Sequence, residues 1–267
     1  MTIGSLFSGI GGLELGLEWA GLGPVMWQVE IDPKCRNCLA KHWPDAERFE
    51  DVCKVGSAEL KPVDIICGGF PCQDVSSAGK RAGLSGARSG LWSEMARVIG
   101  ELRPRWVVIE NVASGGRKWV DAIRIELDRL GYGSLPIPLS AADCGAWHER
   151  ARIFVVAYTR GEHEYEPLYK EQSVNIGGEA RQVFERGGET AAHTDPQQLR
   201  QRLRRSERPN GLRQAFAKQH CGWETEPNLA RVVPGFPGRV DRERALGNSV
   251  VPQCAEVIGN IIKDLAA

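Results

Sequence analysis

The sequence predicts an α/β protein whose doubly wound, Rossmann-like sheet carries a second, smaller region. Short β-branched runs alternate with helical patterns over the first 160 residues. Two of these runs are continuously apolar, as in parallel strands that are buried on both faces. The alternation fails between residues 160 and 220. Sheets of this class bind their ligands at the carboxyl ends of the strands.

Each element is predicted from its own pattern. Apolar or β-branched runs indicate strands at residues 2–7, 25–29, 63–67, 106–110 and 153–158, with a possible further strand ending near residue 51. Helical spacing of apolar residues indicates helices at residues 13–20, 33–42, 91–102 and 118–130. The last predicted element is an amphipathic helix at 251–265, with Pro252 in its first turn, where a missing N–H does no harm.

The stretch from residue 160 to residue 220 is polar and offers no strong strand. We expect an insertion or small domain here. The predicted organisation is a cofactor-binding catalytic domain at 1–159, a small recognition region with a hinge at 160–243, and a C-terminal helix at 244–267 that returns to the first domain.

Composition narrows the class of protein. The 267 residues are 42% hydrophobic and 25% charged, which is typical of a globular chain. The apolar runs are too short for a membrane span, and Glu14 and Glu18 interrupt what would be a secretory signal. Eight scattered cysteines do not form a disulfide framework, so we expect reduced thiols in a cytoplasm, and a monomer.

The net charge of zero conceals a basic block. Residues 196–219 hold seven basic side chains against one acidic, whereas residues 1–66 hold six basic and ten acidic. Such a block indicates a polyanionic partner for one region, or simply a solvated charge run.

Two turns follow predicted strands and carry candidate ligand chemistry. F-S-G-I-G-G at 7–12 lets the backbone approach a ligand, and Glu30 ends the next strand, where an acid binds the ribose of an adenosine cofactor. Glu14 replaces the third glycine of the dinucleotide motif, which disfavours a nicotinamide oxidoreductase.

G-G-F-P-C-Q at 68–73 places Cys72 at a strand end as a candidate nucleophile, beside a glycine-rich loop with Lys80, Arg81 and Arg88. A tight turn and a buried structural cysteine are the ordinary alternatives.

Three further motifs are weak alone. E-N-V at 110–112 puts Glu110 at a strand end, where a carboxyl group can exchange a proton. Arg150 and Arg152 alternate before a strand and are expected to point to the same side, toward carbonyl or phosphate oxygens. G-N-S-V-V-P at 247–252 caps the last helix. Cys35, Cys38 and His42 lack a second pair at ligand spacing, so no metal site is predicted.

Together and in this order, F-S-G-I-G-G-L-E-L-G, G-G-F-P-C-Q, E-N-V, R-A-R-I-F and A-L-G-N-S-V-V-P resemble the signature blocks of the DNA (cytosine-5) methyltransferases, in the compact form of bacteria and phages. The resemblance covers residues 1–158 and 223–267. It implies S-adenosyl-L-methionine as cofactor, double-stranded DNA as partner, and a possible companion restriction endonuclease that forms no stable complex with the enzyme.

The resemblance also implies roles for individual residues. The cofactor would be held by Phe7, Gly9, Ile10, Gly11, Gly12, Glu30, Ile31, Asp51, Val52, Phe70, Leu91, Asn248 and Ser249. The catalytic residues would be Cys72, Glu110, Asn111, Arg150 and Arg152. Cys72 would add to C6 of a flipped-out cytosine, Glu110 would act at N3, and Arg152 would hold O2, with Arg150 in support. The nucleic acid would be contacted by Lys80, Arg81, Arg88, Arg200, Arg202, Arg204 and Arg205.

The sequence departs from the family pattern at Trp147-His148, where a Pro-Gln pair is usual, and His148 is therefore given no catalytic role. Two alternatives stay open. One is an RNA (tRNA) cytosine-5 methyltransferase on the same scaffold. The other is a catalytically silent nucleic-acid-binding protein, which the intact motifs disfavour.

Overall fold

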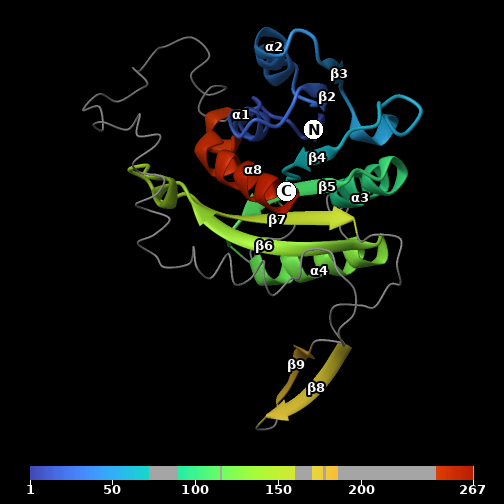
Figure 1. Cartoon of the computed structure of the whole chain (residues 1–267), viewed down its shortest axis with the longest axis vertical. Coiled ribbons are helices and arrows are strands. Elements are labelled where there is room, and N and C mark those ends of the chain that lie inside the picture. Colours follow the sequence, from blue (N-terminus) through green and yellow to red (C-terminus); the bar gives the residue numbers. More distant parts are fainter. Residues whose placement is uncertain (72–89, 115, 160–169, 177–178, 186–244, 267) are drawn as a thin grey trace.

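The computed structural model describes residues 1–71, 90–114, 116–159, 170–176, 179–185 and 245–266, and the following description is confined to them. One mixed sheet of seven strands forms the centre of the molecule (Figure 1). Its order is β3-β2-β1-β4-β5-β7-β6. The first five are parallel, while β7 is antiparallel to both β5 and β6. Their bounds are β1 (Ile3–Leu6), β2 (Val25–Val29), β3 (Glu47–Phe49), β4 (Ile65–Gly68), β5 (Trp106–Val112), β6 (Tyr132–Ser140) and β7 (Ala151–Thr159).

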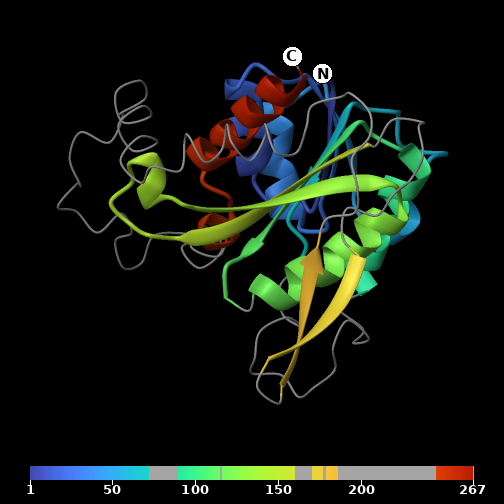
Figure 2. The same cartoon turned by 60° about the horizontal axis from the view of Figure 1, so that its bottom comes forward.

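Helices cover both faces of this sheet (Figures 1 and 2). They are α1 (Gly12–Trp19), α2 (Pro33–His42), α3 (Gly90–Leu102), α4 (Gly116–Arg129) and α8 (Pro252–Ala266), with short 3₁₀ turns η1 (Val52–Lys54) and η3 (Ala142–Cys144). Apolar side chains of α1 and α8 pack in one core cluster, and those of α3 and α4 pack in the other. The doubly wound fold class predicted from the sequence is therefore confirmed.

The last helix, α8, packs against the first helix, α1, and small residues allow the close contact. A Cβ added at Gly16 of α1 would lie 2.1 Å from the carbonyl oxygen of Pro252 and 2.5 Å from the Cβ of Ala255. A Cβ at Gly259 of α8 would lie 2.5 Å from the Cβ of Ala20. Neither position has room for a side chain, so α1 and α8 pack almost backbone to backbone.

Two expectations differ from the structure. No strand was predicted at β6, because Pro136 and Pro138 interrupt the strand pattern there. β6 lies at the sheet edge, where proline is tolerated. The expectation that residues 160–220 offer no strong strand is wrong, because β8 (Lys170–Ile176) and β9 (Glu179–Glu185) form an antiparallel pair. Within the described ranges, no helix is both long and apolar enough to cross a membrane.

Candidate active site

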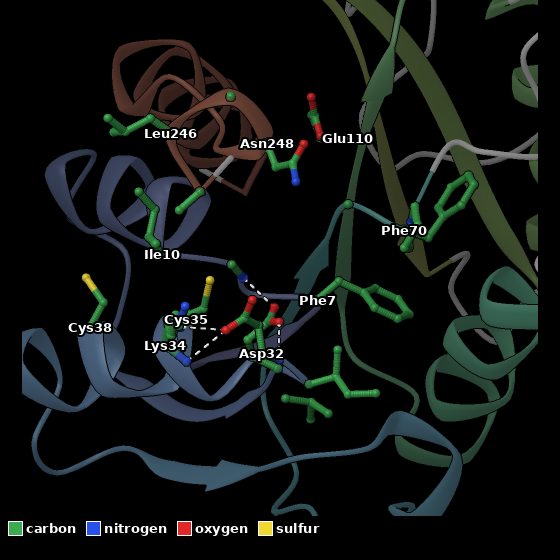
Figure 3. Close-up of a pocket in the computed structure, with 18 of the residues that line it drawn as sticks. Phe7, Ile10, Asp32, Lys34, Cys35, Cys38, Phe70, Glu110, Leu246 and Asn248 are labelled. Atoms are coloured by element: carbon green, nitrogen blue, oxygen red, sulfur yellow. Dashed lines mark hydrogen bonds between the residues drawn. The ribbon is translucent and has the colours of Figure 1, made fainter. Parts of the chain in front are cut away.

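The carboxyl ends of β1, β2, β4 and β5 border a cavity of about 1440 Å³ (Figure 3). The chain order of the sheet reverses between β1 and β4, and doubly wound sheets bind ligands at such a reversal. The cavity walls come from the turns that follow these strands, from the start of α3, and from the turn before α8. The cavity therefore lies at the edge of the sheet where the sequence predicts a ligand site.

The glycine turn after β1 is held to the end of β2 by one carboxylate. Glu30 accepts a hydrogen bond from the Gly9 N–H at 2.7 Å through one oxygen and from the Asp32 N–H at 2.8 Å through the other. Gly9 has φ +56° and Phe7 has φ +55°, a conformation that is uncommon for a side chain as large as phenylalanine. This local strain places the Phe7 ring at the cavity wall.

Most residues that the family resemblance assigns to the cofactor line this one cavity. They are Phe7, Gly9, Ile10, Glu30, Ile31, Asp51, Val52, Phe70, Leu91 and Asn248. The Ile31 side chain is 73% exposed, an unusual state for isoleucine that an apolar ligand surface would relieve. Asp51 also caps η1 by accepting the Cys53 N–H at 3.0 Å, and this bond lowers the pKa of Asp51.

Three residues of the predicted cofactor set lie elsewhere. A Cβ at Gly11 would meet the Trp43 ring at 2.3 Å, so Gly11 serves close packing outside the cavity. A Cβ at Gly12 would lie 2.3 Å from the carbonyl oxygen of Val250. Gly12 and Ser249 line a second, smaller cavity of about 40 Å³ beneath the glycine turn.

Sequence reasoning missed one wall of the large cavity, the exposed face of α2. Its residues are Lys34, Cys35, Asn37, Cys38, Lys41 and His42. Their spacing is that of one helical face, and α2 starts directly after Glu30, so the signal was present. Among the described residues, no group of three His, Cys, Asp or Glu side chains is placed to hold a metal ion. Cys35 and Cys38 are thus cavity-lining thiols (Figure 3).

Glu110 and Arg152 form the charged pair of the site. Arg152 Nε lies 2.8 Å from Glu110 Oε1, across the antiparallel pair of β5 and β7. Glu110 is only 8% exposed, and burial raises the pKa of its carboxyl group, although Arg152 and Arg150 oppose the shift. A carboxyl group in this setting takes up a proton more readily than an exposed glutamate does.

Asn111 holds the turn that leads toward Cys72. Its Nδ2 donates to the Phe70 carbonyl oxygen at 3.0 Å, and its Oδ1 accepts from the Val112 N–H at 2.8 Å. Asn111 is 3% exposed and so bridges the ends of β4 and β5 from within the core. The side-chain nitrogen and the side-chain oxygen of Asn111 both form hydrogen bonds to main-chain atoms, so the residue holds these two segments together.

Arg150 and Arg152 do not act as the same-side pair that alternation predicts. Arg150 precedes the first residue of β7 and has φ +37°, so the period of two does not reach it. Its Nη2 donates to the carbonyl oxygens of Gly247, at 2.7 Å, and Ser249. Burial, with Arg152 nearby, lowers the pKa of Arg150. Arg150 thus binds the turn before α8, whereas Arg152 binds Glu110.

A buried polar group lies beneath the glycine turn and was not predicted. Glu14 and Gln28 are fully buried, and Gln28 Nε2 donates to Glu14 Oε1 at 3.5 Å. Glu14 Oε2 and Gln28 Oε1 have no hydrogen-bond partner. Burial raises the pKa of Glu14 despite hydrogen bonds from Ser5, Ser8 and Gln28. A proton on Glu14 Oε2 would turn this unpartnered acceptor into a hydrogen-bond donor.

Several predicted residues lie outside the described ranges. They are Cys72, Lys80, Arg81, Arg88, Arg200, Arg202, Arg204 and Arg205. Pro71, directly before Cys72, lines the large cavity.

The strand order, the glycine turn after β1 and the acid at the end of β2 are those of a doubly wound, Rossmann-like cofactor-binding fold. The sequence model of the C-5 cytosine-specific DNA methylase family matches residues 1–224. The chain belongs to this family.

Individual relatives agree. The Type II methyltransferase M2.BsuMI of Bacillus subtilis is 35% identical over 59% of this chain and 42% of its own length. The Type II methyltransferase M.AquIA of Picosynechococcus is 34% identical over 59% of this chain and 72% of its own. A crystal structure of an E. coli prophage protein, assigned as a DNA modification methyltransferase, has a TM-score of 0.50 and 31% identity over 60% of this chain and 47% of its own.

The matched part spans less than half the length of M2.BsuMI. The chain shares the family and the fold with these relatives.

Proposed function

We propose that the protein is a DNA (cytosine-5) methyltransferase that transfers the methyl group of S-adenosyl-L-methionine to C5 of a flipped-out cytosine in a specific double-stranded DNA sequence. The observation that carries this proposal is the ion pair of buried Glu110 with partly exposed Arg152, which shares one cavity with the glycine turn, Glu30 and the Pro71 end of the Cys72 turn. A nucleophile, a proton donor and a cofactor site would then meet at one edge of the sheet.

The cavity suits an adenosine cofactor. Glu30 at the end of β2 would bind the ribose hydroxyls, since each of its oxygens accepts one backbone N–H and keeps a further lone pair. Ile31, Val52 and Leu91 offer apolar surface for the adenine. Asn248 would reach the amino-acid end from the turn before α8. When bound, S-adenosyl-L-methionine supplies an electrophilic methyl group on a sulfonium.

The residues of the chain have separate tasks in this reaction. The Cys72 thiolate adds to C6, so C5 gains the electron density needed to take the methyl group. Glu110 donates a proton or hydrogen bond to N3, and burial raises the pKa of its carboxyl group, which makes proton uptake easier. Arg152, fixed by Glu110, holds O2 of the base. Loss of the C5 proton to a base then expels the thiolate and restores the ring.

The proposal also includes the nucleic-acid substrate, the oligomeric state and the cellular location of the enzyme. DNA is favoured over RNA because the relatives named above are Type II methyltransferases and a DNA modification methyltransferase. The Glu110–Arg152 pair argues against a silent binding protein, because it keeps together the acid and the arginine that the proposed reaction needs. The recognition region at 160–243 would contact the DNA, in a monomeric cytoplasmic enzyme with or without a companion restriction endonuclease. None of the cysteines in the described ranges forms a disulfide, which agrees with the proposed cytoplasmic setting.

Methyl transfer can be tested directly. Bisulfite sequencing of host DNA from cells that express the protein should show methylated cytosine in one sequence context. Cys72→Ala should abolish the signal and keep S-adenosylhomocysteine binding. A duplex with 5-fluorocytosine at the target should become covalently attached to the parent protein on a denaturing gel. Unmethylated DNA, or full activity in Cys72→Ala, would overturn the proposal.

A further inference from the structure

Three arginines outside the cavity lining each donate to two main-chain carbonyl oxygens, at least one of which belongs to a residue that lines the cavity. They are Arg36 on α2, Arg97 on α3 and Arg150 before β7. None of them lines the cavity, yet each holds a different turn that does. A guanidinium group suits this task because its planar donors reach several acceptors in a fixed geometry.

Arg36 holds the wall that follows β2. Its Nη1 donates to the carbonyl oxygens of Glu30 and Ile31, both at 2.8 Å. Its Nη2 donates to Glu50 Oε1 at 2.7 Å. Glu30, Ile31 and Glu50 all line the cavity. One side chain therefore joins the β2 turn to the segment that follows β3.

Arg97 holds the wall beyond β3. Its Nη2 donates to the carbonyl oxygens of Val52 and Val55, both at 2.9 Å. Glu94 and Glu101, on the same face of α3, each lie 2.8 Å from the guanidinium group and fix its orientation. These hydrogen bonds, chiefly that of Glu101, raise the pKa of Arg97.

The backbone fits closely around this cluster. Glu101 Oε2 accepts the Ser57 N–H at 2.9 Å, and a Cβ at Gly56 would lie 2.4 Å from the same oxygen. Residues 52–57 are thus bound to α3 at three main-chain atoms. Leu91, on the first turn of α3, lines the cavity, so Arg97 also fixes the distance between Val52 and Leu91.

Arg150 holds the third wall, at the other end of the cavity. It donates to the carbonyl oxygens of Gly247 and Ser249, on either side of Asn248. Asn248 lies across the cavity from Lys34 and Asp32 of the β2 side in the close-up view (Figure 3). Arg150 therefore controls the turn before α8, while Arg36 and Arg97 control the turns after β2 and β3.

We propose that Arg36, Arg97 and Arg150 are positioning residues that shape separate parts of the cofactor site, Arg36 and Arg97 the adenosine part and Arg150 the amino-acid part. This inference rests on the proposed function. It assigns Arg150 to the cofactor site through its carbonyl contacts, in place of a direct part in base chemistry.

Two ligands separate the parts. S-adenosylhomocysteine carries both the adenosine and the amino acid, whereas 5′-methylthioadenosine lacks the amino acid. Dissociation constants for both are measured by calorimetry on the full chain. Arg36→Met and Arg97→Met should each lower the affinity for both ligands by about tenfold, the loss expected when a few charge-assisted hydrogen bonds are removed. Arg150→Met should lower the affinity for S-adenosylhomocysteine to a similar extent. Its affinity for 5′-methylthioadenosine should stay within about twofold of the parental value.

Lysine variants and a control test the role of the donors. Arg→Lys at each position should recover part of the affinity, because an ammonium group can still donate to carbonyl oxygens. If a methionine variant does not fold, its lysine counterpart carries the test. The control is Arg103→Met, since Arg103 donates to the Leu130 carbonyl oxygen at the opposite edge of the sheet and packs over Tyr132. It should lower the melting temperature and leave both affinities unchanged.

The results distinguish a failure of the proposed function from a failure of the positioning role of the three arginines. A parent protein that does not bind S-adenosylhomocysteine contradicts the proposed function itself. Parental affinity in all three folded variants overturns the positioning role alone. Equal losses for both ligands in Arg150→Met overturn the division of the site, and equal losses in Arg103→Met show a general effect of stability.

Discussion

Gly16→Ala tests whether the contact between α1 and α8 is limited by the backbone. Alanine inside a helix is favoured over glycine by about 1 kcal/mol. The added Cβ, however, would lie 2.1 Å from the Pro252 carbonyl oxygen and 2.8 Å from the Glu256 nitrogen. Because these are main-chain atoms, α8 itself must move. Overpacking of this kind costs about 1–3 kcal/mol, and we place it at the upper end.

The expected net loss in the free energy of unfolding is about 2 kcal/mol, or roughly 4–8 °C in melting temperature for a domain near this size. Urea and thermal unfolding followed by circular dichroism measure it. The matched control is Gly100→Ala in α3, where the nearest atom to a new Cβ is Leu130 Cδ2 at 3.4 Å. That variant should gain about 0.4–1 kcal/mol. If Gly16→Ala is also stabilised, the backbone-to-backbone contact described here is wrong.

Three further predictions concern the site and the basic block. Glu30→Ala should weaken S-adenosyl-L-methionine binding by about 1.5–3 kcal/mol, and unchanged affinity in calorimetry would mean that the ribose lies elsewhere. Because the pKa of Glu14 is raised in the folded state, the native protein holds more protons than the unfolded chain above pH 4.5, so its stability should fall as pH rises through the folded pKa. Glu14→Gln should flatten this fall in urea titrations across pH, and a slope identical to that of the parent would show that Glu14 is ionised in both states. Replacing Arg202, Arg204 and Arg205 together by alanine should weaken DNA binding and reduce its log–log salt slope by about one unit per lost phosphate contact, with cofactor affinity unchanged. If the triple variant binds DNA like the parent protein at every salt concentration, the basic block is only a solvated charge run.

The sequence predicted those elements best whose conformation depends mainly on local pattern. Residues 25–29 and 33–42 were predicted with the bounds of β2 and α2, because an apolar strand and a helix that starts with proline leave little choice. The cavity position followed from the same alternation, since it is a property of strand order. Gly177-Gly178 stands between β8 and β9 in the sequence, so the signal for a hairpin was present but was outweighed by polar composition.

Other features depend on contacts that no local pattern records. β6 contains two prolines and is a strand only because it lies at the edge beside β7. Arg150 was expected to share a direction with Arg152, but its positive φ turns it toward the segment before α8. Glu14 sits on the helix after the glycine turn, and only the packing of β1, β2 and α1 reveals that its carboxyl group is buried. Such residues are determined by long-range neighbours.

The large cavity takes one wall from the glycine turn near residue 9 and another from the turn near residue 247. During synthesis, a nascent chain that has not yet released α8 from the ribosome would present the first wall without the other. We expect such a chain to bind a ligand of this cavity weakly or not at all. Once both walls are in place, a single small molecule in the cavity would bridge two segments that lie far apart in the sequence. Cofactor supply in the cell would then influence how long a newly made molecule survives before proteases reach its unfolded state.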